Sequence, residues 1–485
     1  MPDSIPLKDR EHSCTKGPGL WSRLLDRILP FSSPTRLLLL FFVVIIQIAG
    51  QVFSWYALRT GHPGLVFLAV VVWVAWFGLV FIMSRRDTGG LLRRFRKAVY
   101  TGAALVVALL ALMSVAEAIG IHLVNSGVVE DNEMAQALTG CLYYNDATAL
   151  NHQASHLLID GENPYSSSDI VDALEDYDVP LHFLTPLRQG TFAEVFPYPS
   201  EQQMHEALLE AAAFPEASPL EFESKVSYPA GSFLFIAPFV VLGMEDLRLF
   251  YLLCAVIMAA VLLWLGPRNL RPLILLAFVT NIWLWNLIGS GTTDTLYVLF
   301  IFLGWILIRR NILLSALFMG FAAATKQIAW LFILFYLVLL LRELGWKRTL
   351  QSIGIIGATF VGINLPFIFS APEAWLGGVL APVLDPMFPQ GHGIVAFSIL
   401  GILPPNSLLF TLIETAVLAA GLIWYYFNCR KYPHTGLLLA VLPLFFAWRS
   451  YSVYFCMSAL IIFGVILVEE FSRKQEERTR TLLAD

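Results

Sequence analysis

The sequence predicts an all-α membrane protein that crosses the bilayer many times. Its 485 residues are 57% hydrophobic and only 14% charged, whereas about a quarter of the residues in a soluble domain are charged. Uninterrupted apolar runs at 37–58, 63–83 and 100–124 each reach the roughly 20 residues that a helix needs to cross the hydrocarbon core. A transmembrane β-barrel would instead show short segments of alternating polarity. We therefore expect a bundle of about 12–13 transmembrane helices and no large soluble domain.

The distribution of basic residues predicts how these helices are oriented. Loop 84–98 carries six Lys and Arg residues but a single acid, Asp87, and loops of this kind stay in the cytoplasm. The basic segment 1–36 and the tail 471–485 are expected to be cytoplasmic as well. The apolar run after residue 36 is too long for a cleaved secretory signal. Two helices precede the basic loop and one follows it, which predicts that loop 125–228 lies on the external side of the cell membrane.

The apolar segments after residue 228 predict a broken or re-entrant helix. Arg342 is expected inside, so an odd number of crossings must separate it from the external loop. The candidate segments there number six: 229–244, 249–266, 271–289, 292–309, 312–325 and 327–342. The weakest of them are 229–244, which contains Pro238, and 312–325, which is short. Further helices are expected at 350–369, 406–427, 435–448 and 451–469.

Loop 125–228 is the most distinctive segment of the chain. It contains 18 of the 36 Asp and Glu residues but only two of the 31 Lys and Arg residues. Near its start, Asn145 or Asp146 can cap a helix, and Gly161 and the following Asn-Pro pair end it. We expect this helix to be amphipathic and to lie along the outer membrane surface. Asp146 is then either a simple helix cap or a partly desolvated carboxylate that can act as a general base.

Several short motifs follow one another along the chain. They are Asn145-Asp146 with Asp160-Gly-Glu-Asn-Pro-Tyr165, Tyr228-Pro229 with Pro238, Gly289-Ser-Gly-Thr-Thr-Asp294, Gly320-Phe-Ala-Ala-Ala-Thr-Lys326-Gln327, and Trp448-Arg-Ser-Tyr451. In this order they resemble motifs of the GT-C superfamily of integral-membrane glycosyltransferases. The resemblance covers residues 100–465 and is to the bacterial branch related to polyprenol-phosphate-mannose-dependent mannosyltransferases, glycosyltransferase family 87.

This resemblance implies a GT-C-like fold and a hexosyltransferase. The hexose, with mannose as the first candidate, would pass with inversion from a polyprenyl-phosphate donor to a lipid or glycan acceptor on the external side. Asp146 would be the catalytic base, and Lys326 and Arg449 would stabilise the phosphate. The resemblance implies no obligatory cofactor, and a divalent metal, Mg²⁺ or Mn²⁺, stays an open alternative. The further substrate-binding residues that it implies are Asp294, Tyr165 and Tyr228.

The residues themselves leave alternatives open. Lys326 borders apolar runs, where a lysine is costly; it either reaches a lipid phosphate or snorkels to the interface. The same alternatives hold for Arg449, between two apolar helices. Asp294 can cap the next helix or help to position the donor or a metal. His392, between two glycines of the external stretch 371–405, is either idle or part of a loop that closes over the sugar.

The rest of the sequence shows no complete motif for binding a metal ion or a nucleotide. His152 and His156 have a spacing that can bind a metal ion, but no third ligand follows them, so we expect them to be packing residues. The chain has no dinucleotide fingerprint and no phosphate-cradling loop, and no nucleic-acid partner is expected. A sugar carried on a lipid phosphate needs instead a base, cations for the departing phosphate, and access from the lipid.

Two other classes of function compete with the enzyme. A transporter or flippase of a lipid-linked solute would place its charged residues near the bilayer midplane, in broken helices. A membrane scaffold would use the acidic loop to dock a partner and would tolerate the loss of Asp146. The regions of the chain are the cytoplasmic segment 1–36, an N-terminal hairpin and basic loop 37–98, a membrane core 99–370, a C-terminal membrane region 371–470, and the tail 471–485.

Overall fold

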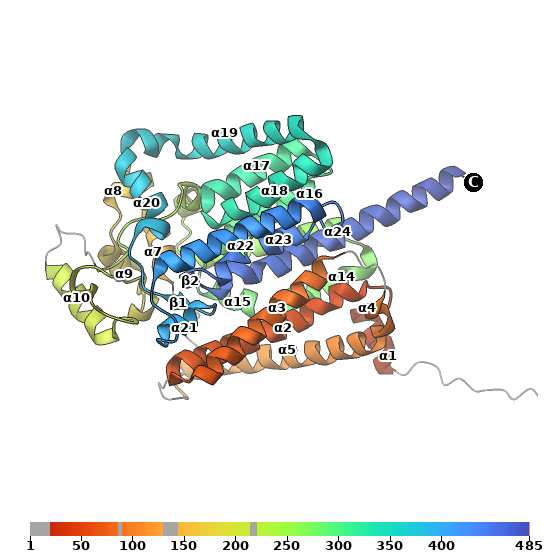
Figure 1. Ribbon diagram of the computed structural model, residues 1–485, viewed down its shortest axis with the longest axis horizontal. Coiled ribbons are helices and arrows are strands. Elements are labelled where there is room, and N and C mark those ends of the chain that lie inside the picture. The colour runs from red at the N-terminus through yellow and green to blue at the C-terminus, as the bar shows by residue number, and fades with distance from the viewer. Residues whose placement is uncertain (1–19, 86–89, 130–143, 214–220, 485) are drawn as a thin grey trace, which may run out of the picture.

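The computed structural model confirms the predicted all-α membrane fold (Figure 1). It describes residues 20–85, 90–129, 144–213 and 221–484, so much of the predicted cytoplasmic segment 1–36 lies outside the described residues. Within them, seven helices are long and apolar enough to cross a membrane, which identifies a multi-pass membrane protein. These helices are α2 (Thr35–Thr60), α3 (Pro63–Ser84), α5 (Arg96–Asn125), α13 (Leu247–Leu265), α19 (Trp346–Ser370), α22 (Ser407–Asn428) and the Ser452–Glu470 part of α24 (Ser452–Ala484).

The apolar segments between the long helices are shorter or bent. The stretch Arg268–Val279, which contains α14 (Arg271–Val279), meets α15 (Ile282–Gly289) at a bend of 52°. This break is of the kind predicted for the region, but it falls at a segment that the sequence did not single out. The other helices of this group, each shorter than 18 residues, are α11 (Gly231–Leu234), α12 (Ala237–Val241), α16 (Asp294–Leu307), α17 (Ile312–Thr325), α18 (Ile328–Leu344) and α23 (Thr435–Leu439).

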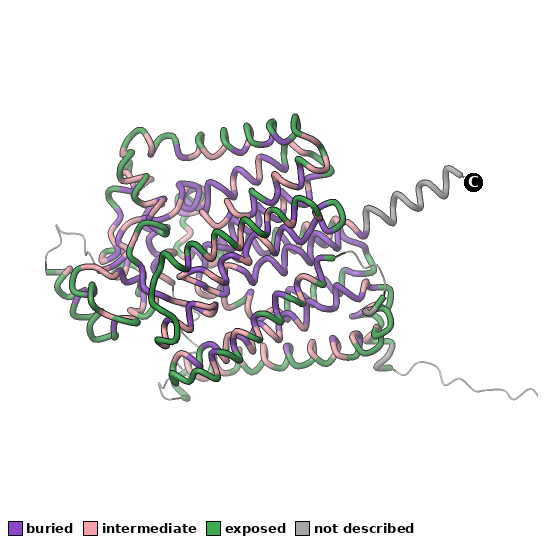
Figure 2. The backbone as a smooth tube through the Cα atoms, viewed as in Figure 1, coloured by how far each residue is buried: buried purple, intermediate pink, exposed green. Residues whose placement is uncertain are grey.

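The described chain has fewer full-length spans than the sequence predicts, namely seven, or eight if the bent pair is one span. The physical reason is visible in α16, which is buried along almost its whole length. Its apolar character therefore reflects the protein interior as much as lipid. Figure 2 shows buried residues concentrated along central helices such as α16 and α24, whereas the outer helices α5 and α22 are mostly exposed.

The predicted external loop folds into short helices at one end of the bundle (Figure 1). Segments from the last third of the chain join them there, including the two short strands. The elements at this end are α7 (Asp146–Ile159), α8 (Pro164–Ser167), α9 (Ile170–Tyr177), η2 (Leu181–Phe183), η3 (Gly190–Phe192), α10 (Glu201–Ala213), α20 (Pro372–Leu384), β1 (Gln390–Gly391), α21 (Val395–Ile399) and β2 (Arg449–Ser450). The opposite end carries α1 (Leu20–Ile28), α4 (Leu91–Arg94) and the end of α24.

Helix α7 begins where the sequence predicts but is placed differently. The Asn145 side chain accepts a hydrogen bond from the Thr148 amide at 2.8 Å and so caps the helix. The expected amphipathic character is wrong, because the first part of α7 is buried on every side, polar residues such as Asn151 and Ser155 included. It packs against α9, α11 and α12. α7 therefore forms an inner wall of the protein, whereas the smaller α9 is amphipathic, with Ile170 and Ala173 buried.

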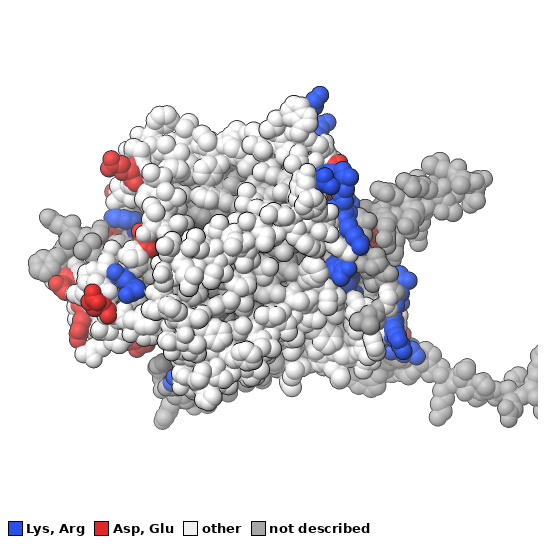
Figure 3. All heavy atoms as spheres, in the orientation of Figure 1, with Lys and Arg blue, Asp and Glu red and all other residues white. Residues whose placement is uncertain are grey.

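Charged side chains separate between the two ends of the bundle. On the face shown in Figure 3, Lys and Arg gather at the end that carries α4 and the α18–α19 junction, whereas most Asp and Glu lie at the other end, around α9 and α10. The surface between the two ends is uncharged on this face. This distribution has the form expected of a protein whose middle lies in the bilayer.

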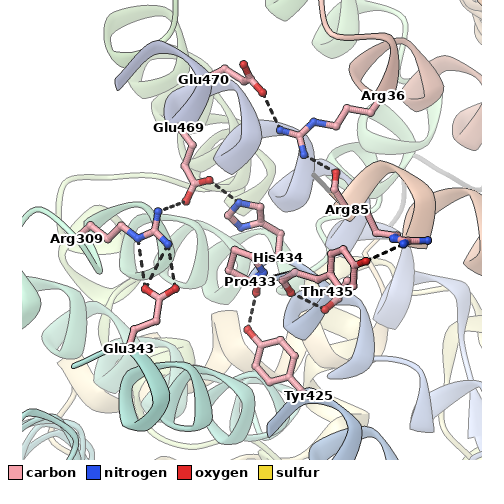
Figure 4. Close-up of polar contacts among 11 residues, drawn as sticks. Arg36, Arg85, Arg309, Glu343, Tyr425, Pro433, His434, Thr435, Glu469 and Glu470 are labelled. Carbon is pink, nitrogen blue, oxygen red and sulfur yellow. Dashed lines mark hydrogen bonds and ion pairs between the residues drawn. The ribbon is translucent and has the colours of Figure 1, made fainter. Parts of the chain in front are cut away.

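A network of charged residues joins five elements at the basic end (Figure 4). We call it the basic-end network. It connects α2, the end of α16, α18, the turn before α23, and α24. Its polar pairs are Arg36–Glu470 (2.9 Å), Arg309–Glu343 (3.0 Å), Arg309–Glu469 (3.4 Å) and His434–Glu469 (2.7 Å).

Candidate active site

Backbone pairing brings three distant segments together at the acidic end. Leu187 donates its amide to the Glu221 carbonyl at 2.8 Å, and Glu223 donates to the Thr185 carbonyl at 3.0 Å. Leu187 also pairs with Met387, from the segment after α20. Residues 185–187 therefore lie between the end of the acidic loop and the segment that follows α20, and they hold these two segments together.

The two short strands carry a fourth segment to the same place. β1 and β2 pair in parallel, with Gln390 opposite Arg449 and Gly391 opposite Ser450. Gly391 has a φ of +115° and lies so close to the Ser450 carbonyl that a Cβ atom would collide with it. A glycine is therefore required at this position. The pairing sets Arg449 facing the acidic loop rather than leaving it in a flexible turn.

Arg449 makes only neutral contacts in this arrangement. Its guanidinium donates to the Tyr451 hydroxyl at 2.7 Å and to the Thr185 hydroxyl at 3.5 Å, and it contacts the Met387 sulfur at 2.7 Å. The Tyr451 hydroxyl in turn donates to the Gln390 side chain. The Nε atom of Arg449 is buried and has no hydrogen-bond partner. Arg449 thus retains positive charge and donor capacity for an anionic group.

Asp146 faces this arginine from the start of α7. Its side chain is only 8% exposed, and one carboxylate oxygen accepts the Ala147 amide at 2.7 Å. Burial raises the pKa of Asp146 above its ordinary value, although hydrogen bonds from the Thr185 side chain and the Ala147 amide, and the charge of Arg449, oppose the rise. A carboxylate in such surroundings is a stronger base than one in water.

Glu223 is a second carboxyl group in the same place, and sequence reasoning missed it. It is half-buried. Burial raises the pKa of Glu223 to about 7, the negative charge of Asp146 adds to the rise, and Arg449 opposes it. No sequence signal separates Glu223 from the many solvated acids of the loop. Only the pairing of residues 185 and 223 reveals its position, and it gives a role to part of the stretch 170–225, for which the sequence offered none.

Lys326 and Asp294, predicted separately, form one buried ion pair. The Lys326 ammonium lies 2.9 Å from Asp294 Oδ2 and 3.4 Å from the Thr293 hydroxyl. Lys326 is 5% exposed and Asp294 1%, so Lys326 does not snorkel to the interface. The ammonium also lies over the Tyr228 ring, at 4.8 Å. The other Asp294 oxygen is buried without a hydrogen-bond partner.

Tyrosines connect this ion pair to Arg449. The ring of Tyr454, in the first turn of α24, lies 5.9 Å from the Lys326 ammonium and packs edge-on against Tyr451 at 5.4 Å. Tyr451 contacts Arg449 directly. The two predicted cations therefore lie on opposite sides of a pair of tyrosines, within one continuous polar cluster.

Tyr165 and Tyr228 occupy different positions relative to the cluster. The Tyr228 ring faces Lys326, whereas the Tyr165 ring is buried between Phe233 and Phe367. The Tyr165 hydroxyl donates to the Tyr228 carbonyl at 2.7 Å. In this structure Tyr165 positions Tyr228.

His392 is partly buried and packed against neighbouring segments. Its amide donates to the Ser450 carbonyl at 2.7 Å, and its ring packs against Trp73 of α3 at 6.0 Å. A Cβ atom on Gly393 would collide with the Phe445 carbonyl, so this neighbour is tightly packed as well. Burial lowers the pKa of His392 to about 4, so the ring is neutral at physiological pH.

The histidine pair of α7 is divided between interior and surface. His152 is buried and stacks on Tyr177 at 4.6 Å, whereas His156 is exposed. Among the described residues, no group of three or more His, Cys, Asp or Glu side chains could hold a metal ion.

No protein-family model, curated protein or solved structure matches this chain. The fold defines a multi-pass membrane protein, and the polar cluster at the acidic end is the part of it suited to chemistry. The function of the protein must therefore be inferred from the chemistry of these side chains.

Proposed function

We propose that this protein is a membrane glycosyltransferase. It transfers a hexose, mannose first, from a polyprenyl-phosphate donor to a lipid or glycan acceptor on the external face. The single observation that carries the proposal is the buried Asp146 carboxylate beside Arg449, a base and a cation held together at one end of a membrane bundle. The distribution of charge supports the external placement, because the opposite end is the basic one.

The reaction assigns one task to each of these two groups. Asp146 removes the proton from the acceptor hydroxyl as its oxygen attacks the anomeric carbon of the donor. The bond from that carbon to the phosphate oxygen breaks, and the electron pair leaves with the polyprenyl phosphate. Arg449 stabilises the charge that develops on the phosphate, because its present contacts are neutral and an anionic oxygen is a better acceptor. One base and direct displacement give inversion.

Lys326 takes a different role from the one that the resemblance implies. Asp294 already neutralises it at 2.9 Å, so it offers less charge to a phosphate than Arg449 does. The pair holds Tyr228 and Tyr454 in place beside the site. Tyr228, Asp294 and Lys326 therefore form the wall of the donor site, and Arg449 is the principal phosphate ligand.

The Lys326–Asp294 pair is also the observation that favours the second candidate function. Buried ion pairs between apolar helices are typical of transporters, and a flippase for a lipid-linked sugar would use the same ligand. The pair lies at helix ends, since Asp294 begins α16 and Lys326 follows α17. This position favours the enzyme.

The decisive experiment is sugar transfer by purified protein. Polyprenyl-phosphate mannose and polyprenyl-phosphate glucose are offered separately, with membrane extract from the source cell as acceptor. Wild type is compared with Asp146→Asn and with a control, Asp172→Asn, on the outer face of α9. We expect transfer to fall about 10²–10⁴-fold in Asp146→Asn and to be unchanged in the control.

Two results would contradict the proposal. Undiminished transfer by a folded Asp146→Asn variant would remove Asp146 as the base and make Glu223 the next residue to test. Absence of transfer by the wild type with either donor, together with donor movement across vesicles that contain the protein, would establish the flippase instead.

A further inference from the structure

Two basic residues share one tyrosine at the basic end of the bundle. Arg85, which follows α3, donates its guanidinium to the Tyr432 hydroxyl at 2.7 Å and lies 4.6 Å from the centre of the tyrosine ring. The Lys431 ammonium lies 5.1 Å from the same ring centre. Both basic residues are exposed. Two positive charges therefore lie close together at the surface of the protein. We call these three residues the Tyr432 cluster.

The positive charge of the Tyr432 cluster is not matched by an acid. Within the described part of the chain, no ion pair joins Arg85 or Lys431 to an acidic side chain. The neighbouring Arg36 donates to the Arg85 carbonyl, but Arg36 has its own acid, Glu470, at 2.9 Å (Figure 4). Hydrogen bonds from Lys431 and Arg85 lower the pKa of the Tyr432 hydroxyl. Negative charge is therefore favoured at this point.

The turn between α22 and α23 brings further basic residues. Arg430, next to Lys431, donates to the Arg342 carbonyl near the end of α18 at 2.9 Å. The Arg342 guanidinium lies over the Tyr426 ring at 4.6 Å, and its Nε atom is buried without a hydrogen-bond partner. These two arginines also form no ion pair with a described acid. The turn thus adds positive charge beside the Tyr432 cluster.

Apolar side chains of two membrane-crossing helices border the Tyr432 cluster. Trp424 of α22 stacks on Tyr432 at 6.3 Å and contacts Phe81 of α3 at 5.9 Å. Ile82 of α3 and Phe427 of α22 are exposed, and both helices are long and apolar enough to span the bilayer. The cluster therefore lies where α3 and α22 reach one membrane surface. A ligand with a charged head and apolar chains fits this boundary, whereas a free anion would use only its charged part.

We propose that the Tyr432 cluster binds the phosphate group of an anionic phospholipid. Arg85 and Lys431 supply positive charge and hydrogen-bond donors to the phosphate oxygens, and the acyl chains lie along α3 and α22. The basic end is expected in the cytoplasm, and the cytoplasmic leaflet carries anionic lipids that attract basic residues beside membrane helices. This lipid site lies at the opposite end from the candidate active site and does not depend on sugar transfer.

Titration of the purified protein with lipid in detergent tests the site. The apparent Kd is measured by native mass spectrometry for phosphatidylglycerol, which is anionic, and for phosphatidylcholine, which has no net charge. We expect the wild type to bind phosphatidylglycerol more tightly. Lys431→Gln should weaken that binding about fivefold, the effect of one basic residue near a membrane surface. It should leave phosphatidylcholine binding unchanged. Arg85→Gln should weaken phosphatidylglycerol binding at least as much.

The matched control is Lys347→Gln, which removes the same charge from an exposed lysine in the first turn of α19. Its affinity for phosphatidylglycerol should equal that of the wild type. The unfolding midpoint of each variant without lipid shows that it is folded. Equal weakening by Lys431→Gln and Lys347→Gln would overturn the proposal, because general surface charge would then account for binding.

Two further results would overturn the lipid site. The first is equal affinity of the wild type for the two lipids. The second concerns inorganic phosphate, added alone as a probe of a free anion. Phosphatidylglycerol should raise the unfolding midpoint of the wild type, and inorganic phosphate at the same concentration should not. An equal rise with inorganic phosphate, lost in Lys431→Gln, would identify a site for a free anion instead.

Discussion

The two ends of the bundle hold charged clusters that are built in opposite ways. In the basic-end network, each of the three acids has a basic partner within 3.4 Å, and Glu469 has two, Arg309 and His434 (Figure 4). At the acidic end, Asp146 and Glu223 face one arginine that bonds to neutral atoms. One oxygen of Asp294 there is buried without a partner.

This difference indicates what each cluster is for. A network whose charges are matched has little free charge for a ligand, and this one joins the start of α2, the end of α18 and the middle of α24. The cluster at the acidic end has an excess of acidic groups, and its arginine bonds only to neutral atoms, so both can interact with a substrate. Such unmatched buried charges lower the stability of the free protein, and substrate binding can restore it. The comparison predicts that substitutions in the basic-end network change stability and that substitutions of Asp146 and Arg449 change activity.

The largest effect is expected at the buried pair of the basic end. Arg36→Ala would leave Glu470 buried without its partner at 2.9 Å, with both side chains at most 10% exposed. Loss of one member of such a pair costs about 3–5 kcal/mol, measured by denaturant unfolding in detergent. Sugar transfer per folded molecule should not change. The double variant Arg36→Met with Glu470→Met should recover much of the stability, and a loss of transfer at full stability would break the comparison.

The next effect should appear in activity rather than in stability. Arg449→Lys keeps the charge but cannot reach Tyr451, Thr185 and a phosphate at once. Transfer should fall roughly 100-fold while the unfolding midpoint changes little. The control is Arg188→Lys, an arginine of the same paired region that lies over the Phe388 ring at 6.0 Å. Equal losses in the two variants would contradict the assignment of Arg449 to the phosphate.

A smaller effect is expected for Tyr165, which the sequence resemblance places among the substrate-binding residues. Tyr165→Phe removes only the hydroxyl that donates to the Tyr228 carbonyl at 2.7 Å. We expect a loss of about 1–2 kcal/mol in stability, because the carbonyl keeps no donor in its place. KM for the donor should stay the same. A raised KM with unchanged stability would show instead that the hydroxyl touches the substrate.

The sequence predicts the features of this protein that depend on local patterns. Apolar runs and basic loops predict the membrane fold, and the Asn145 cap predicts the start of α7. Asp146 and Arg449 are selected through the motifs that resemble those of the GT-C superfamily, and their roles stay predictions. The features that sequence reasoning missed depend on long-range pairing. Thr185 and Arg449, for example, are 264 positions apart.

Long-range contacts also explain why Lys326, His392 and α7 have other surroundings than the sequence suggests. Lys326 and Asp294 are each costly in an apolar setting, but no pattern indicates that the two neutralise each other. His392 stands between glycines, which are typical of flexible loops, but here the glycines permit close strand pairing. Helix α7 looks amphipathic by periodicity, while packing from three other elements buries its polar side too.

The smallest effect is expected for an exposed ion pair of the basic-end network, and it tests whether burial makes an ion pair stabilising. Arg309 and Glu343 form a close contact at 3.0 Å, but the arginine side chain is 51% exposed. Solvent and salt screen such a pair, so Glu343→Gln should cost less than about 1 kcal/mol, and the cost should shrink further at high salt. Arg36→Ala, measured in the same detergent, should keep most of its cost at high salt because its pair is buried. If Glu343→Gln proves as destabilising as Arg36→Ala, the network acts as one cooperative unit, and its stabilising energy cannot be assigned to the buried pair alone.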